Sequence, residues 1–180
     1  MRAFIAGALL LSVSPLHANE GTFEGCSLTT WVIFRAVNNF SLGVPLSKAK
    51  SAAGIPANVA ANIEVAYDIA KKKGLEEAYF VGHVFYRKCS GDLAKQKKTL
   101  SSVETAYKDC AYKSATRMYI LVRIKEGIPI SETKSNMPKQ FHELITTLYR
   151  TSQENNLTKA LAMSAESHMS CIAAVQPKYR

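Results

Sequence analysis

The chain has 180 residues, a formal net charge of +9 at pH 7 and 47% hydrophobic residues. This length fits one domain or two small fused domains. Beyond an apolar run at the N-terminus, no segment is long and apolar enough to cross a membrane, so we expect no transmembrane segment.

The N-terminus is typical of a secretory signal peptide covering residues 1–18. A charged start at Arg2 is followed by an apolar run over residues 4–13 and by the small residue Ala18. The run is shorter than the roughly 20 apolar residues that span a bilayer. Cleavage after Ala18 leaves residues 19–180 with a net charge of +8, because Arg2 is the only charged residue removed. The alternative interpretation is a buried first helix.

The first half of the remaining chain, residues 19–91, has helical apolar spacing interrupted by glycine and proline. Helices are predicted over residues 28–42, 56–73 and 75–88, with a short helical turn over residues 47–53. Gly43 and Gly74 supply left-handed stops. Residues 81–86 are the one stretch where a strand is an alternative. Residues 90–100 are expected to form a polar turn that joins the two halves.

The second half, residues 92–180, has the same plan. Ser101 and Glu104 have the spacing of a capping box, which predicts a helix start there. Gly127 ends that helix, and Asn156 stands where the first half has a glycine stop. Helices are predicted over residues 101–126, 138–154 and 157–175.

The two halves carry one pattern twice, which predicts a tandem duplication with a two-residue deletion. Six residues recur 84 positions later, and six more recur 82 positions later. The first set is Cys26, Gly43, Pro45, Ser47, Lys50 and Ser51, matched by Cys110, Gly127, Pro129, Ser131, Lys134 and Ser135. The second set is Pro56, Ile63, Tyr67, Leu75, Ala78 and Cys89, matched by Pro138, Ile145, Tyr149, Leu157, Ala160 and Cys171. We therefore expect an all-α fold of two similar three-helix units.

The four cysteines are expected to form two disulfides, because an even number in an exported chain is typical of disulfide pairing. Four cysteines allow three pairings. The duplication selects Cys26–Cys89 and Cys110–Cys171, since each repeat then closes on itself over nearly equal spans of 63 and 61 positions. In the chain-entropy model, each closure stabilises the fold by about 4 kcal/mol.

Little in the sequence indicates catalysis. His83, His142 and His168 lack the spacing of a zinc site, and no glycine-rich phosphate loop or nucleophilic serine motif is present. We expect no catalytic residue, no metal and no cofactor. A hydrolase with an acidic-residue site remains an alternative, and the adjacent carboxylates Glu76 and Glu77 are more simply exposed charges at a helix start.

Basic residues between the middle of the first half and the junction form the predicted binding surface. An exported basic protein attracts anionic cell wall, anionic lipid or an acidic protein. Ordinary solvated helix ends are the alternative. The repeated aromatics Tyr67 and Tyr149 are included as a paired contact site, although half-buried packing with a hydrogen-bonded hydroxyl is the simpler interpretation. The basic candidates are Lys71, Lys72, Lys73, Arg87, Lys88, Lys95, Lys97 and Lys98.

The order of these features resembles small, all-helical, two-cysteine exported proteins of bacteria and their phages. The resemblance is carried by Cys26, Gly43, Pro45, Ser47, Tyr67 and Cys89 and by their counterparts in the second half. Some similar proteins neutralise enzymes that attack the cell wall, among them the amidase-immunity proteins of type VI secretion and the spackle protein of T-even phages. Those families usually carry one unit, whereas this chain carries two, and no catalytic residues transfer.

We therefore expect a periplasmic or secreted binding protein without enzymatic activity. The leading hypothesis is an inhibitor or immunity protein that blocks a protein partner in the envelope, such as a cell-wall hydrolase. One alternative is a structural or chaperone-like envelope protein that holds anionic partners, and another is the acidic-site hydrolase. An exported chain is not expected to bind nucleic acid.

Overall fold

The computed structural model describes residues 21–51, 60–96 and 99–176, and every regular element in these ranges is helical. The all-α prediction is therefore confirmed. In chain order the elements are α1 (Phe23–Ser41), α2 (Leu46–Lys50), α3 (Ala61–Lys73), α4 (Leu75–Ala94), α5 (Ser102–Lys125), α6 (Ile130–Ser135), the 3-10 helix η2 (Lys139–Phe141), α7 (His142–Glu154) and α8 (Leu157–Val175).

Three predictions fall outside the described residues. The signal peptide predicted over residues 1–18 is one, and the helix start predicted at Pro56 is another. The third concerns Lys97 and Lys98, two of the eight basic binding candidates.

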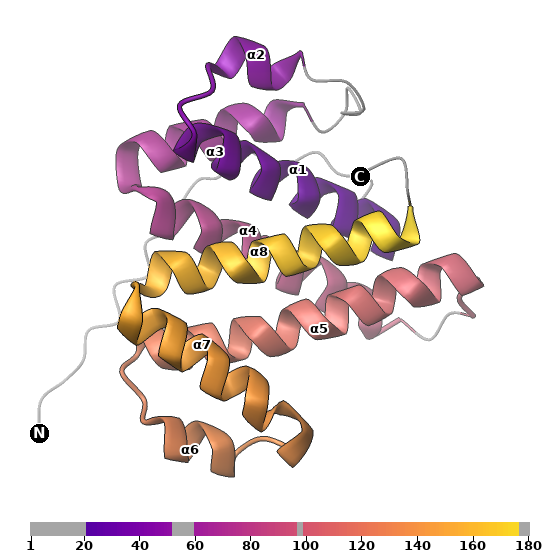
Figure 1. The fold of residues 1–180 in the computed structure, drawn as a ribbon. Helices are drawn as coiled ribbons and strands as arrows, with labels where there is room; N and C mark the ends of the chain where they lie inside the picture. Colours follow the sequence, from indigo (N-terminus) through magenta and orange to yellow (C-terminus); the bar gives the residue numbers. More distant parts are fainter. Residues whose placement is uncertain (1–20, 52–59, 97–98, 177–180) are drawn as a thin grey trace, which may run out of the picture.

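The long helices α1, α4, α5 and α8 form the centre of the molecule, and each contacts the other three. Helix α3 packs on α1 and α4 at one end, with α2 beside it, and α7 packs on α5 and α8 at the opposite end, with α6 beside it (Figure 1). Both halves of the chain therefore contribute two helices to one central bundle.

The buried apolar side chains of both halves form one continuous cluster. Phe34 of α1, Tyr86 of α4, Tyr107 of α5 and Leu161 of α8 are each no more than 1% exposed. Burying a large apolar side chain contributes about 1.5–3 kcal/mol. The halves consequently stabilise each other through a shared core, and neither buries its apolar helix faces alone.

Helices α1 and α4 approach closely at Gly82. A Cβ atom built there would lie 2.6 Å from Cε1 of Phe34 and 3.1 Å from Cγ2 of Ile33. Phe34 is fully buried and cannot move aside without disturbing the core. This contact explains a glycine inside a helix despite its cost of about 1 kcal/mol. The strand considered for residues 81–86 is wrong, because this segment lies within α4.

Two helices extend beyond their predicted ends. Helix α1 begins five residues before the predicted start, because the hydroxyl oxygen of Thr22 accepts a hydrogen bond from the Gly25 amide at 3.0 Å. Helix α4 continues to Ala94 and buries Leu93, so the polar turn predicted from residue 90 is wrong over its first residues. The predicted division between residues 91 and 92 lies inside this helix.

The predicted helix stops are confirmed. Gly43, Gly74 and Gly127 have φ angles of 71°, 88° and 70°, which L side chains rarely adopt. Asn156 has φ 148° and is the one non-glycine residue with positive φ in the described part of the chain. Its side-chain oxygen also accepts a hydrogen bond from the Lys159 amide at 2.9 Å, so the same residue caps α8.

Both predicted disulfides are present, and all four cysteines of the chain are paired. The Cys26–Cys89 bond joins α1 to α4, and the Cys110–Cys171 bond joins α5 to α8. Each bond therefore links two helices of the central bundle that come from the same half of the chain.

Glu104 connects the first turn of α5 to the start of α1. The Ser101 hydroxyl oxygen accepts a hydrogen bond from the Glu104 amide at 3.2 Å, as the capping-box prediction requires. The Glu104 carboxylate instead accepts hydrogen bonds from the amides of Phe23 and Glu24, at 2.8 and 3.1 Å. This side chain caps a helix 80 positions away and joins the two halves.

Replacing this carboxylate is expected to destabilise the fold. We expect Glu104→Gln to lower the free energy of unfolding by about 1–2 kcal/mol, because half-buried amides of α1 lose a charged acceptor. Glu126→Gln makes the same charge change at an exposed position, the C-cap at the opposite end of α5, and is expected to shift stability by less than about 0.5 kcal/mol. Urea unfolding of both variants measures the difference, and equal stabilities would contradict the cross-helix cap.

Candidate functional site

His83 and His168 lie in the core and not at the surface. Their side chains are 1% and 3% exposed. His83 Nε2 lies 3.4 Å from the Leu161 carbonyl oxygen, and His168 Nε2 lies 3.3 Å from that of Ser27. A carbonyl only accepts, so the proton of each neutral ring resides on Nε2. Each histidine thus donates a hydrogen bond to the other half of the chain.

Burial keeps both imidazoles neutral. Desolvation lowers the pKa of His83 to about 4 and that of His168 to about 3, against a smaller opposing effect of the backbone carbonyls. The Phe34 ring lies 4.6 Å from the His83 ring and 5.6 Å from the His168 ring, measured between centroids. Both histidines are therefore structural groups that substrate cannot reach. Within the described ranges, no group of three or more His, Cys, Asp or Glu side chains is arranged to hold a metal ion.

The six basic candidates within the described residues do not form one patch. Lys71–Lys73 are exposed at the end of α3, next to the first residue of α4. Arg87, Lys88 and Lys95 are exposed near the other end of α4. Arg87 lies twelve positions after Leu75, which places the two groups about 18 Å apart along the helix axis. The second group is the one that borders a hollow surface.

Tyr67 and Tyr149 are mostly buried, at 8% and 7% exposure. The Tyr67 hydroxyl donates to the Val44 carbonyl oxygen at 2.9 Å, and the Tyr149 hydroxyl donates to that of Ile128 at 2.7 Å. Both phenols therefore hold the loops that follow the glycine stops. Their role in binding stays a prediction, and the candidate site below does not include them.

A groove of about 710 Å³ lies between α4 and α5. Its apolar lining combines small side chains with two exposed larger ones, Val84 at 44% and Tyr112 at 60% exposure. The groove is lined by Phe23, Val84, Arg87, Lys88, Ser90, Gly91, Asp92, Ala94, Lys95, Lys108, Ala111, Tyr112 and Ala115. The lining residues of α5 recur at helical spacing, which gives that wall one continuous face.

Four cations line this groove. Arg87 and Lys88 come from α4, Lys95 is the C-cap residue that directly follows it, and Lys108 comes from α5. The one carboxylate among the lining residues is Asp92, whose Oδ1 lies 3.0 Å from the Lys95 ammonium. The lining therefore carries a net charge of +3. We call these thirteen lining residues the basic groove.

Sequence reasoning missed Lys108 and Tyr112. Both lie on the first half of α5, outside residues 71–98, which contain the basic candidates predicted from the sequence. The signal that points to them is the spacing of Lys108, Ala111, Tyr112 and Ala115, which places polar, small and aromatic side chains on one helix face. That face lines a groove only because α5 packs beside α4, which the sequence does not reveal.

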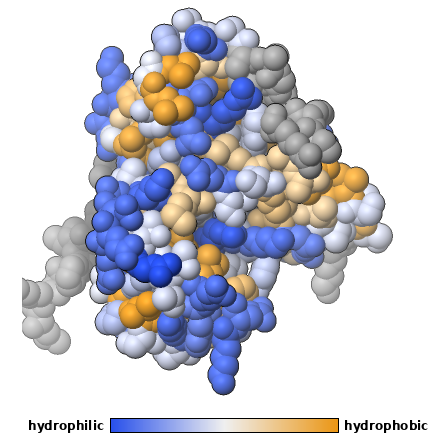
Figure 2. All heavy atoms as spheres, in the orientation of Figure 1, coloured by the Kyte–Doolittle hydropathy of each residue, from blue (hydrophilic) through white to orange (hydrophobic). Residues whose placement is uncertain are grey.

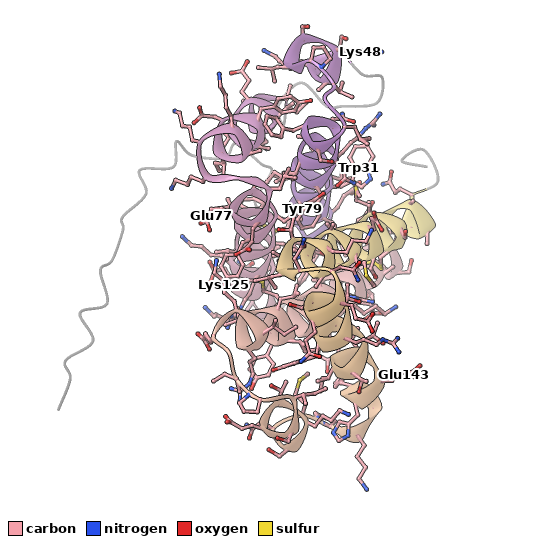
Figure 3. The ribbon with its side chains drawn as sticks, turned by 60° about the vertical axis from the view of Figure 1, so that its left-hand side comes forward. Trp31, Lys48, Glu77, Tyr79, Lys125 and Glu143 are labelled. Atoms are coloured by element: carbon pink, nitrogen blue, oxygen red, sulfur yellow. A yellow bond between two sulfur atoms is a disulfide. The ribbon has the colours of Figure 1, made fainter. Side chains whose placement is uncertain are left out.

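The far end of the α4–α5 pair is held by Lys125. Its ammonium lies 3.5 Å from Glu76 Oε1, 3.7 Å from Glu77 Oε2 and 4.3 Å from the centroid of the Phe80 ring. Figure 3 shows Glu77 and Lys125 on the same side of the molecule. The adjacent carboxylates considered for a hydrolase thus face a lysine that connects the two helices, which favours a structural role for them.

One face of the molecule shows a mixed surface. On the face in Figure 2, hydrophobic residues form separate patches between hydrophilic ones. None of the helices in the described ranges combines the length and hydropathy needed to cross a membrane.

The basic groove can bind a ligand that presents both anionic and apolar groups. Its cations attract carboxylate or phosphate oxygens, and Val84 and Tyr112 offer apolar surface that is lost to water on binding. Comparisons with protein-family models, curated proteins and solved structures gave no significant match. The chemistry of the groove itself is therefore the basis of the functional proposal.

Proposed function

We propose that this chain is an exported binding protein without enzymatic activity, an inhibitor or immunity protein that blocks a cell-wall or envelope-acting enzyme. The observation that carries the proposal is the basic groove, with its net charge of +3 and the 60% exposed Tyr112. Tyrosine and arginine are enriched among the residues that contribute most to protein–protein affinity. The sequence features of export and the paired cysteines support a location in an oxidising compartment outside the cytoplasm.

The two disulfides support this proposal because they hold the groove walls. Cys89 lies in α4 between Lys88 and Ser90, and its bond reaches α1. Cys110 lies in α5, two residues after Lys108, and its bond reaches α8. A wall fixed to the helix beneath it loses little conformational freedom when a partner binds, and this preorganisation favours affinity.

The proposed duplication also bears on the groove. It is supported by the matching hydrogen bonds of Tyr67 and Tyr149 and by the matching positive φ angles of Gly74 and Asn156. Under this alignment the α4–α5 face corresponds to the face between α8 and α1, which also pack together. Lys108 corresponds to Glu24.

The corresponding face carries different residues at the positions that make the groove. Arg87 and Lys88 correspond to Met169 and Ser170. Ala115 corresponds to Trp31, which is 5% exposed and stacks against Arg35 at 5.0 Å from the ring centroid. The positive charge therefore belongs to one of two related faces, which favours a specific role for that face.

Affinity capture with the mature, oxidised protein tests the proposal. From an envelope extract we expect one protein to be captured one-to-one and to resist moderate salt, and its enzymatic activity to fall on addition of the bait. Broad, salt-sensitive capture would instead favour the chaperone-like alternative. Turnover of cell-wall fragments by the protein itself would favour the acidic-site hydrolase and overturn the proposal.

A charge-reversal pair locates the binding surface. We expect R87E/K108E to weaken binding of the captured partner by at least about tenfold, because cations facing partner carboxylates become repulsive. K71E/K73E makes the same charge change at exposed positions at the C-terminal end of α3, away from the groove, and is expected to bind almost normally. Equal losses in both variants, measured by calorimetry, would show that net charge and not the groove governs binding.

A further inference from the structure

We infer that the basic groove receives an acidic amphipathic helix of the partner protein. This inference rests on the proposed function, since it names the part of the partner that the groove recognises. Three features of the groove carry it: its length between two helices, the small side chains of its floor and the position of its cations.

The groove has the dimensions of a helix-binding site. From Val84 to Lys95, the α4 wall runs about 16 Å along its axis, which is about three helical turns. From Lys108 to Ala115, the α5 wall runs about 10 Å. A third helix can lie along the hollow between two packed helices, with its side-chain ridges in their grooves. The volume of about 710 Å³ is large enough for several side chains.

Small residues let a helix backbone come close. Gly91 and Ala94 of α4 and Ala111 and Ala115 of α5 line the groove. Val84 and the exposed ring of Tyr112 then offer apolar contact to the side chains that a docked helix directs inward. On the corresponding face, Trp31 stands in place of Ala115, and its indole is buried there.

The cations specify the charge of the docked helix. Arg87, Lys88 and Lys95 belong to the α4 wall and Lys108 to the α5 wall, so the hollow is bordered by positive charge on both sides. A helix with an apolar stripe flanked by Asp and Glu matches this arrangement. A second copy of this chain does not, because a symmetric contact would set the same cations against each other.

An anionic membrane surface also fits less well. A flat layer of lipid headgroups contacts protruding side chains, whereas the small apolar residues of this groove, such as Ala111 at 5% exposure, lie in a hollow. Lipid headgroups would meet the lysines and leave the apolar floor unfilled. A segment of protein can pack against the apolar floor and, at the same time, place carboxylates next to the cations.

Site-specific photocrosslinking tests the inference. Tyr112→p-benzoylphenylalanine places the photoreactive group inside the groove, and Val103→p-benzoylphenylalanine places it on the same helix, 48% exposed and outside the groove. Both full-length proteins are exported, oxidised and irradiated with the captured partner. We expect crosslinks from position 112, at least about tenfold above those from 103, to a partner segment with apolar residues at helical spacing and flanking Asp or Glu.

The outcomes separate this inference from the proposed function. A synthetic peptide of the crosslinked segment is expected to bind the wild type and to bind R87E/K108E at least about tenfold more weakly. Crosslinks to lipid, to a second copy of this chain or to a segment without acidic residues would overturn the inference. If the protein inhibits its partner but crosslinks only from position 103, the proposed function stands and the groove inference fails. If no protein is captured at all, both fail.

Discussion

Acidification from neutral pH to about pH 4 is expected to cost this protein several kcal/mol of stability through His83 and His168. Their folded-state pKa values, about 4 and about 3, lie below the usual 6.5. Between pH 6.5 and the folded-state pKa values, both histidines are protonated in the unfolded chain and neutral in the folded chain. Stability is therefore fully present above about pH 6.5, falls as the pH falls through this window, and stops falling below the folded-state values.

The size of the effect follows from the pKa differences. At about 1.4 kcal/mol per pKa unit, each histidine contributes on the order of 3–5 kcal/mol across its window. The physical cause is local. Neither Nδ1 atom has a hydrogen-bond partner among the described residues, and aromatic rings of Phe34 and Tyr86 lie against the imidazoles. A proton added at Nδ1 would create a buried charge without an acceptor.

Glutamine substitution separates this effect from general acid sensitivity. The amide nitrogen of glutamine can donate to the same carbonyl as Nε2, but glutamine does not titrate. We expect H83Q/H168Q to be less stable than the wild type near neutral pH and to lose much less stability on acidification. Urea unfolding at several pH values between about 7 and 4 measures both slopes. Parallel slopes for wild type and variant would show that other groups cause the acid response.

Removing either disulfide is expected to lower the free energy of unfolding by about 4 kcal/mol. Each bond closes a long loop, of 63 or 61 positions, and so restricts the unfolded chain strongly. The variants C26A/C89A and C110A/C171A test the bonds separately. Alanine is the suitable replacement because Cys26 and Cys110 are 0% and 2% exposed, and a serine hydroxyl would be buried there.

The shared core predicts how these variants unfold. The apolar side chains of α1, α4, α5 and α8 form one cluster, so loss of either disulfide should weaken a single cooperative transition. Thermal unfolding followed by calorimetry and by circular dichroism measures this. Two separated transitions in either variant would mean that the halves fold independently.

The local features of this fold could be predicted from the sequence because single residues determine them. Glycine, asparagine and proline mark the ends of helices. The positive φ angles at Gly43, Gly74, Gly127 and Asn156 show that these residues adopt the backbone conformation that ends a helix. The cysteine pairing followed from the repeated pattern and needed no three-dimensional information. The extension of α4 to Ala94 was not predicted, because the residues around Leu93 are mostly polar. The burial of Leu93 depends on tertiary packing that the local sequence does not show.

The candidate site could be predicted only in part, because it depends on which helices lie side by side. Lys71–Lys73 and Arg87–Lys88 are near in sequence, but most of the length of α4 separates them. Lys108 is farther along the chain yet lines the same groove as Arg87. Glu104 shows the same limit, since its local capping motif gave no sign that its carboxylate reaches α1.

Radical footprinting of Tyr112 tests most directly whether the basic groove is the binding surface. The ring is 60% exposed in the free protein, so hydroxyl radicals should oxidise it readily. Val103, at 48% exposure on the same helix, is the internal control. When the captured partner is added, we expect oxidation of Tyr112 to fall severalfold while oxidation of Val103 is unchanged. Unchanged oxidation of Tyr112 in the saturated complex would contradict a partner docked between α4 and α5.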